Sequence, residues 1–151
     1  MNKADILDTV SAILVATIGD RKFCFDIQDI YTTVNFDQAR IKYSSANSCA
    51  IEIGEDVIPL VALGDLFDLV ENRSESDSRI IIIEIKNKKV GFFVDSIVEI
   101  INFDGRNRSK LELIADTDYC TYSFGTLIYE DEYIYPNLPK IIESIFTQYQ
   151  N

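Results

Sequence analysis

The 151-residue sequence predicts a mainly β fold in which two similar small β-barrel subdomains lie side by side, with a short central helix and a C-terminal α-helix. Three observations support this prediction. Two units, near residues 13–37 and 80–104, can be aligned without a gap. Apolar residues within both units alternate with a period of two, which is typical of strands. Helical periodicity is confined to one short central segment and the C-terminal end.

The repeat is clearest where "KFCFDIQDIYTTVNFD" is set above "KVGFFVDSIVEIINFD". The identical pairs are Lys22/Lys89, Phe25/Phe92, Asn35/Asn102, Phe36/Phe103 and Asp37/Asp104. In each copy the alternation breaks once, at 28–29 and at 95–96, which predicts a strand, a tight bend or bulge, and a second strand. With the strand upstream of it, each copy is a hairpin followed by a third strand. Three strands leave open edges, so we expect each unit to curl and close with strands from elsewhere, and a groove to form between the two intertwined subdomains.

Outside the repeat, a strand is expected around Val57–Val61, followed by one or two helical turns over 64–70. The polar run 71–78 reads as a surface loop. Residues 122–136 read as a hairpin with three acidic residues at its tip, and 138–150 as an amphipathic helix with Pro139 in its first turn. We expect a single domain over 12–146, after an extension over 1–11.

Charge and composition narrow the classes of partner. A net charge of −11 makes nucleic acid and anionic membrane poor partners. No apolar run approaches the roughly 20 residues of a membrane span, so we expect no membrane insertion and a cytoplasmic protein. Cys24, Cys49 and Cys120 are odd in number and lack CxxC spacing, which indicates single buried thiols in a reducing compartment.

The sequence gives little support to catalysis. It contains no histidine, which excludes the usual imidazole base. Its acidic clusters are Asp26/Asp29, Glu52/Glu55/Asp56 and Glu130/Asp131/Glu132. We expect these on outward faces or loop tips, and we expect neither a cofactor nor a metal. An enzyme that uses a carboxylate pair ranks last, and its signature would be two acids with raised pKa values in one pocket.

The sequence gives more support to a protein-binding surface than to catalysis. In the second copy Val98 and Ile100 form one apolar face of a strand, with Ile97 and Ile101 on the other. The counterparts of Val98 and Ile100 in the first copy are Tyr31 and Thr33. A strand that is apolar on both faces either is buried on both or presents one face to a partner, and both alternatives stay open.

Four segments together resemble the CheW family of chemotaxis coupling proteins. They are "ILVATIGDRKFCFDIQDIYTTV", "DVIPLVALGDLFDL", "RIIIIEIKNKKVGFFVDSIVEI" and "GTLIYEDEYIYPNLPKIIESI". The resemblance implies two SH3-like five-stranded barrels and a non-catalytic adaptor without a cofactor. Such an adaptor couples the cytoplasmic tips of methyl-accepting chemoreceptors to a CheA-type histidine kinase and is recruited to membrane receptor arrays. The alternative is a paralogue with the same fold that binds only one of these partners or serves another pathway.

The resemblance also suggests candidate residues. A receptor's helical hairpin would dock in the groove between the barrels, for which the candidates are Ile30, Tyr31, Thr32, Thr33, Val98 and Ile100. The kinase-interface candidates are Gly54, Glu55 and Asp56. The family usually carries an arginine in the slot of Gly54, and a glutamate in the slot of Thr32. Glycine cannot replace a bidentate arginine, so these departures predict altered partner chemistry.

Overall fold

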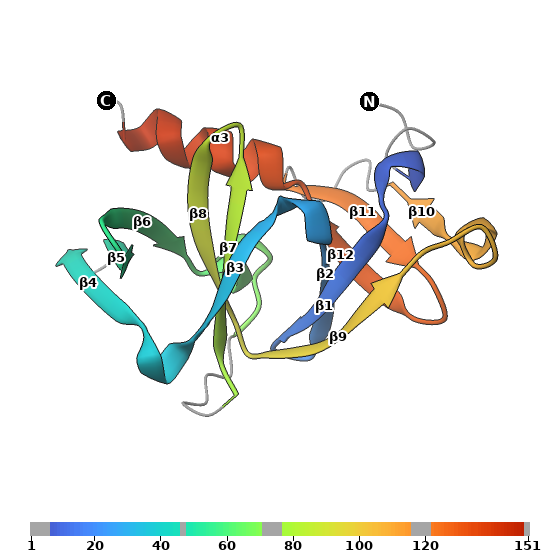
Figure 1. The fold of residues 1–151 in the computed structure, drawn as a ribbon, viewed down its shortest axis with the longest axis horizontal. Helices are drawn as coiled ribbons and strands as arrows, with labels where there is room; N and C mark the ends of the chain where they lie inside the picture. The colour runs from blue at the N-terminus through green and yellow to red at the C-terminus, as the bar shows by residue number, and fades with distance from the viewer. Residues whose placement is uncertain (1–6, 46–47, 71–76, 116–121, 150–151) are drawn as a thin grey trace.

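The computed structural model describes residues 7–45, 48–70, 77–115 and 122–149, and it confirms a mainly β fold (Figure 1). The strands are β1 (Ala12–Ile18), β2 (Arg21–Asp26), β3 (Ile30–Asn35), β4 (Arg40–Ser45), β5 (Ser48–Ile53), β6 (Asp56–Val61), β7 (Arg79–Ile85), β8 (Lys88–Val94), β9 (Ser96–Asn102), β10 (Glu112–Ile114), β11 (Ser123–Ile128) and β12 (Glu132–Pro136). The chain also forms the helices α2 (Leu63–Leu66) and α3 (Leu138–Tyr149) and the 3₁₀ turns η1 (Ile27–Asp29), η2 (Phe36–Gln38) and η3 (Arg108–Lys110).

The strands form two sheets of the same design. Sheet A has the order β10-β11-β12-β2-β1-β9, and sheet B has the order β3-β7-β8-β6-β5-β4. Each sheet therefore has six strands rather than five, and the sequence pattern does not indicate β4, β5 or the short β10. A parallel contact joins the two parts of each sheet, β12 to β2 in sheet A and β6 to β8 in sheet B.

The third strand of each repeat belongs to the other repeat's sheet. β1 and β2 pair as a hairpin in sheet A, but β3 crosses over and pairs with β7 in sheet B. Likewise β7 and β8 pair in sheet B, whereas β9 pairs with β1 in sheet A. The registers match: Ile13 pairs with Ile101, and its repeat counterpart Ile80 pairs with Val34. The repeat is therefore a reciprocal exchange of third strands.

Tight turns close the repeated hairpins at the places that the sequence indicates. Ile18 pairs with Arg21 across Gly19, whose φ of 61° suits the first position of a two-residue turn that glycine adopts without strain. The β7–β8 turn uses Lys86 and Asn87, with φ of 52° and 66°. Positive φ at both central residues is the pattern of a type I′ turn, which matches the twist of the flanking strands.

The main core lies between the two sheets. Its centre includes Phe23 and Phe25 from β2 and Phe92 from β8, all fully buried. α3 covers it with Leu138, Ile141 and Ile142, as Figure 1 shows at the top of the molecule. The helical spacing of these apolar residues thus serves packing. Smaller clusters fill each sheet's own concave face.

Other expectations have mixed outcomes. Within the expected extension 1–11, residues 7–11 are described, and Val10 is fully buried in the smaller cluster of sheet A. The expected loop 71–78 falls mostly outside the described residues. Cys24 is buried as expected, Cys49 is half-buried, and Cys120 lies outside the described residues. None of the helices in the described part of the chain is long and apolar enough to cross a membrane.

Candidate protein-binding site

The exposed candidates for the receptor groove are set by two matching bulges. In β3 the pairing with β7 steps from Ile30 directly to Thr32, which leaves Tyr31 outside the ladder. In β9 the pairing with β1 steps from Glu99 to Ile97 and leaves Val98 outside it. An extra residue in one strand bends that strand and redirects its side chain. Tyr31 and Val98 are 51% and 48% exposed.

The next outward position repeats the correspondence. Thr33 is exposed on β3, and its counterpart Ile100 is 55% exposed on β9. The remaining candidates, Ile30 and Thr32, are both half-buried, and Ile30 packs against the main core. Of the six groove candidates, four are thus exposed and two are half-buried.

β9 resolves the two alternatives for a strand that is apolar on both faces. Ile97 packs against the main core and Ile101 against the smaller cluster of sheet A. Val98 and Ile100 remain exposed, and Glu99 between them is exposed as well. Packing therefore accounts for the face with Ile97 and Ile101 only, and the face with Val98 and Ile100 is exposed to solvent. Figure 1 shows β9 at the lower edge of sheet A, outside β1.

The kinase-interface candidates form the tip of one hairpin. Ile53 pairs with Asp56, so Gly54 and Glu55 make a two-residue turn between β5 and β6. Gly54 has a φ of 60°, and a Cβ there would meet nothing within 4 Å. The backbone of the turn therefore favours glycine, which adopts this φ without strain, although Lys86 and Asn87 adopt similar angles in the β7–β8 turn. All three candidates are exposed.

Lys89 connects the two sets of candidates. Its Nζ lies 4.2 Å from the centroid of the Tyr31 ring and 3.2 Å from Oδ2 of Asp56. A third contact joins it to Oε2 of Glu84 at 3.8 Å. The hydrogen bond with Asp56 raises the pKa of Lys89. Sequence reasoning missed this link, because Lys89 and its three partners come from four strands. Only the equivalence of Lys22 and Lys89 in the repeat singled the lysine out.

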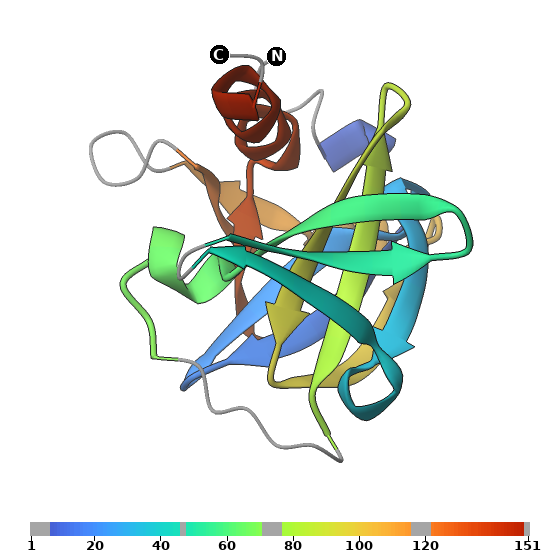
Figure 2. The ribbon, with the colours of Figure 1, turned by 90° about the vertical axis from the view of Figure 1, so that its left-hand side faces the viewer.

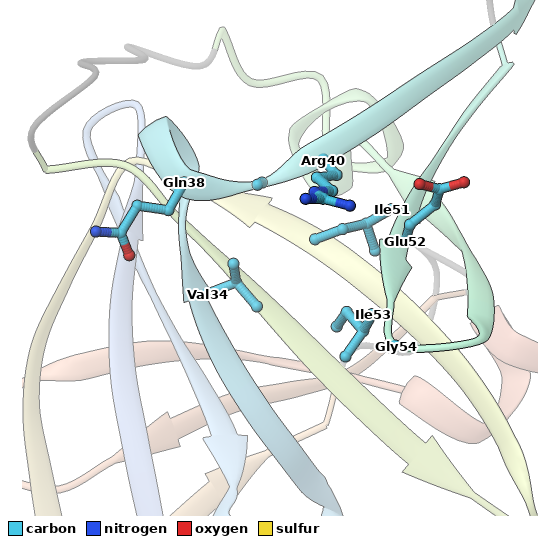
Figure 3. A pocket seen from close by; sticks show the side chains of 8 residues that line it. Val34, Gln38, Arg40, Ile51, Glu52, Ile53 and Gly54 are labelled. Carbon is cyan, nitrogen blue, oxygen red and sulfur yellow. The ribbon is translucent and has the colours of Figure 1, made fainter.

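A cavity of about 290 Å³ lies beside the same hairpin. Figure 2 shows that sheet B curls strongly, and among the described strands β3 and β4 each pair with one neighbour only, so the curl stays open between them. The cavity occupies this opening. Its lining comes from the end of β3, from η2, and from β4 and β5, and consists of Val34, Gln38, Ala39, Arg40, Ile51, Glu52, Ile53 and Gly54 (Figure 3).

Asp26 and Asp29 differ from the sequence prediction of outward-facing acids. Asp26 is only 5% exposed, because β2 ends inside the fold at the crossover to β3. Burial raises the pKa of Asp26, while hydrogen bonds from Gln28 oppose the rise. Burial also raises the pKa of Asp29 to about 6, and the charge of Asp26 adds to it. Neither residue lines the cavity described above, so the pocketed acid pair that would indicate an enzyme is not formed there.

The other acidic clusters follow the prediction more closely. Glu55, Asp56, Glu130, Asp131 and Glu132 are exposed at hairpin tips, and Asp131 accepts a hydrogen bond from Lys22 at 2.6 Å. In the described part of the chain, no three Cys, Asp or Glu side chains gather closely enough to hold a metal ion.

The structure thus consists of two intertwined β-subdomains whose edge strands β3 and β9 present matching exposed side chains. The sequence model of the CheW-like domain matches residues 12–145, and the chain belongs to this family. Among solved structures, the scaffolding protein TtCheW from Thermoanaerobacter tengcongensis has a similar fold, with a TM-score of 0.68, 23% sequence identity and 86% of each chain covered. No curated protein sequence matches the chain at a significant level.

Proposed function

We propose that the protein is a non-catalytic signalling adaptor that couples the cytoplasmic tips of chemoreceptors to a CheA-type histidine kinase in bacterial chemotaxis. Membership of the CheW-like family supports this function. The observation that carries it is the pair of matching bulges, which present Tyr31 and Val98 at equivalent places on the two sheets. The function would place the protein in the cytoplasm at membrane receptor arrays.

The proposed receptor-binding surface consists of the exposed β3 and β9 side chains Tyr31, Thr33, Val98 and Ile100. Exposed apolar residues on edge strands such as β3 and β9 are what an amphipathic helix needs in order to bury its own apolar face. Large side chains such as Tyr31 and Ile100 would supply most of the binding free energy. Ile30 and Thr32 would support this surface from inside the fold.

The proposed kinase-binding surface is the β5–β6 tip, with Gly54, Glu55 and Asp56. Its charge is acidic, so the matching kinase surface should be basic. Lys89 would then contact both surfaces at once, through Tyr31 on one side and Asp56 on the other. Binding of one partner could thereby change the position of a side chain that the other partner contacts.

The test is a pull-down from the native cytoplasm with the intact protein as bait, followed by mass spectrometry. Three variants would be compared with the unmodified bait: Ile100→Glu on the receptor-binding surface, Glu55→Lys on the kinase-binding surface, and Ile114→Glu as the control. Ile114 is 51% exposed, close to the 55% of Ile100, but lies on β10 at the opposite edge of sheet A.

We expect the unmodified bait and Ile114→Glu to recover both a methyl-accepting receptor and a CheA-type kinase. Ile100→Glu should lose the receptor, since a charge would have to be buried at the interface. Glu55→Lys should lose the kinase. Recovery of only one partner by the unmodified bait would favour the paralogue, for which the glycine in the arginine slot is the supporting observation. Recovery of neither would reject the adaptor.

A further inference from the structure

The cavity in the open side of sheet B combines an apolar floor with a cationic rim. Val34, Ile51 and Ile53 supply the floor, and all three belong to the small apolar cluster of this sheet or pack against it. The cavity is therefore continuous with a hydrophobic core and is not a shallow dent in a polar surface. A volume of about 290 Å³ is near the lower limit of ligand pockets and has room for a large side chain.

The charges at the rim do not cancel. Glu52 is held by Lys42, whose Nζ lies 2.5 Å from its carboxylate. Arg40 stands opposite Glu52 in the register of β4 and β5, and among the described residues no carboxylate forms an ion pair with its guanidinium. Figure 3 shows Arg40 at the mouth, beside Ile51 and across from Val34. A free guanidinium over an apolar floor is notable in a chain with a net charge of −11.

We propose that this cavity is a docking site for a large apolar side chain of a partner protein that carries a carboxylate next to it. The side chain would fill the gap between β3 and β4 and extend the apolar cluster of sheet B. The neighbouring carboxylate would accept hydrogen bonds from Arg40, whose planar guanidinium suits a carboxylate. Net charge makes a second copy of this acidic chain a poor occupant.

The wall on the hairpin side leaves room for the approach. Gly54 has no side chain, and the space where its Cβ would lie is open. Ala39, on the other side, has a short side chain next to Arg40. The site is thus bounded by small residues on two sides and by Arg40 at the mouth. The cavity shares Gly54 with the proposed kinase-binding surface, but this inference goes beyond the proposed function because it holds for any partner that carries the stated side chains.

The test uses the full-length protein and three blocked tripeptides, N-acetyl-Asp-Phe-Asp-amide, N-acetyl-Asn-Phe-Asn-amide and N-acetyl-Asp-Ala-Asp-amide. Each is titrated into ¹⁵N-labelled protein while amide shifts are recorded by NMR. We expect Asp-Phe-Asp to bind with a Kd on the order of millimolar, as befits a ligand of this size. The shifts should centre on Val34, Ala39, Arg40 and residues 51–54. Asn-Phe-Asn should bind about threefold to tenfold more weakly because it lacks the charge-assisted bond, and Asp-Ala-Asp should not bind.

Two variants and one control separate the contributions. Arg40→Gln should bind Asp-Phe-Asp and Asn-Phe-Asn equally, and both as weakly as the unmodified protein binds Asn-Phe-Asn. Ala39→Leu should fill the cavity and abolish binding of both. Arg21→Gln removes an exposed positive charge from the start of β2 in the other sheet, so it should keep the preference for Asp-Phe-Asp.

Three results would overturn the proposal. Shifts centred elsewhere would show that the cavity is not the site. An unchanged preference in Arg40→Gln, a safely exposed position that should not affect folding, would show that the guanidinium does not select the carboxylate. Concentration-dependent shifts of the same amides without any peptide would assign the surface to a second copy of the chain.

Discussion

The chain crosses between the sheets twice, and the two crossovers solve the same problem differently. From β8 to β9 the link is a single residue, Asp95, whose buried carboxylate accepts a hydrogen bond of 2.7 Å from the N–H of Gly19. Its own N–H donates to the carbonyl of Thr17 at 2.8 Å. Both bonds reach into the β1–β2 hairpin, so this crossover is fastened to the sheet that it enters.

From β2 to β3 the link is η1, and the hydrogen bonds to its buried carboxylate come from within the crossover itself. Asp26 accepts two hydrogen bonds, of 3.3 and 3.1 Å, and both come from Gln28 in the same turn. Asp29 lies close enough for the charge of Asp26 to raise its pKa. The comparison teaches that equivalent crossovers in a repeat need not be equally stable. The β8–β9 crossover is bonded to a hairpin distant in sequence, whereas the β2–β3 crossover holds two carboxylates that repel each other.

The largest expected effect breaks the well-anchored crossover. Asp95→Ala removes the acceptor of the Gly19 N–H and should lower the free energy of unfolding by about 2–3 kcal/mol, since a hydrogen bond to a charged and buried carboxylate is lost. Urea unfolding followed by circular dichroism measures the loss. Asp95→Asn is the matched control, because it keeps one oxygen acceptor, and it should lose clearly less. Equal losses for the two variants would contradict this role of the carboxylate.

A second variant compares the packing of the two repeated hairpins, β1–β2 and β7–β8. Gly91 on β8 occupies the repeat position of Cys24 on β2. A Cβ at Gly91 would lie 2.5 Å from Cδ2 of Leu60 and 3.1 Å from Cδ1 of Ile82. Gly91→Cys should therefore destabilise the protein by about 2 kcal/mol through overpacking. The measurement is again urea unfolding, and relief of the loss in the double variant with Leu60→Val would confirm the cause.

The strained crossover should become more stable when its charge is removed. Asp29 ionises near pH 4 in the unfolded chain but near 6 in the folded one, so its burial destabilises the fold increasingly as pH rises from about 4 to 6, and fully above that. Asp29→Asn should therefore raise the free energy of unfolding at pH 7 by about 1 kcal/mol, a value reduced for the partial exposure of the carboxylate. At pH 4 the gain should disappear.

Unfolding measured at pH 4, 5, 6 and 7 checks this dependence. The control is Asp37→Asn, which removes one exposed charge from η2 and so reproduces the change in net charge. A similar gain in the control would assign the effect to net charge and not to the crossover.

The smallest effect compares the repeated lysines. Lys22 contacts Asp131, with 42% of its side chain exposed, whereas Lys89 is 21% exposed and contacts Tyr31, Asp56 and Glu84. Lys89→Met should lower the urea midpoint more than Lys22→Met, because more contacts at a less exposed site are lost. A double variant with Tyr31→Leu should lose less than the sum of the single variants. An additive result would show that the lysine and the ring do not interact.

Much of the fold follows from local pattern. The period-two alternation and the turn at Gly19 place the repeated hairpins, and the spacing of Leu138, Ile141 and Ile142 places α3. The exchange of β3 and β9 could not be derived, because alternation shows which face of a strand is buried but not which hairpin the strand joins. β4 was missed because its Arg40 and Lys42 are exposed at an edge, where the polar pattern resembles a loop.

The candidate site was predicted only in part. The apolar character of Val98 and Ile100 indicated a binding face, and the structure shows both side chains in solvent. The contacts of Lys89 depend on four strands coming together, β3, β6, β7 and β8, which no local pattern encodes. Asp26 was expected outside because carboxylates are rarely buried without partners; its partner is the neighbouring Gln28.

The exchange of third strands has a consequence for how the chain can be divided. A cut between Val70 and Asp77 separates the two copies of the repeat, yet each piece then holds a hairpin, β1–β2 or β7–β8, that lies within the sheet supplied mainly by the other piece. Neither fragment can bury its own apolar surface alone, and each offers the other a ready template. The two halves of the chain therefore depend on each other to fold. The two fragments, expressed separately, would make a split reporter that gains structure only when both are present.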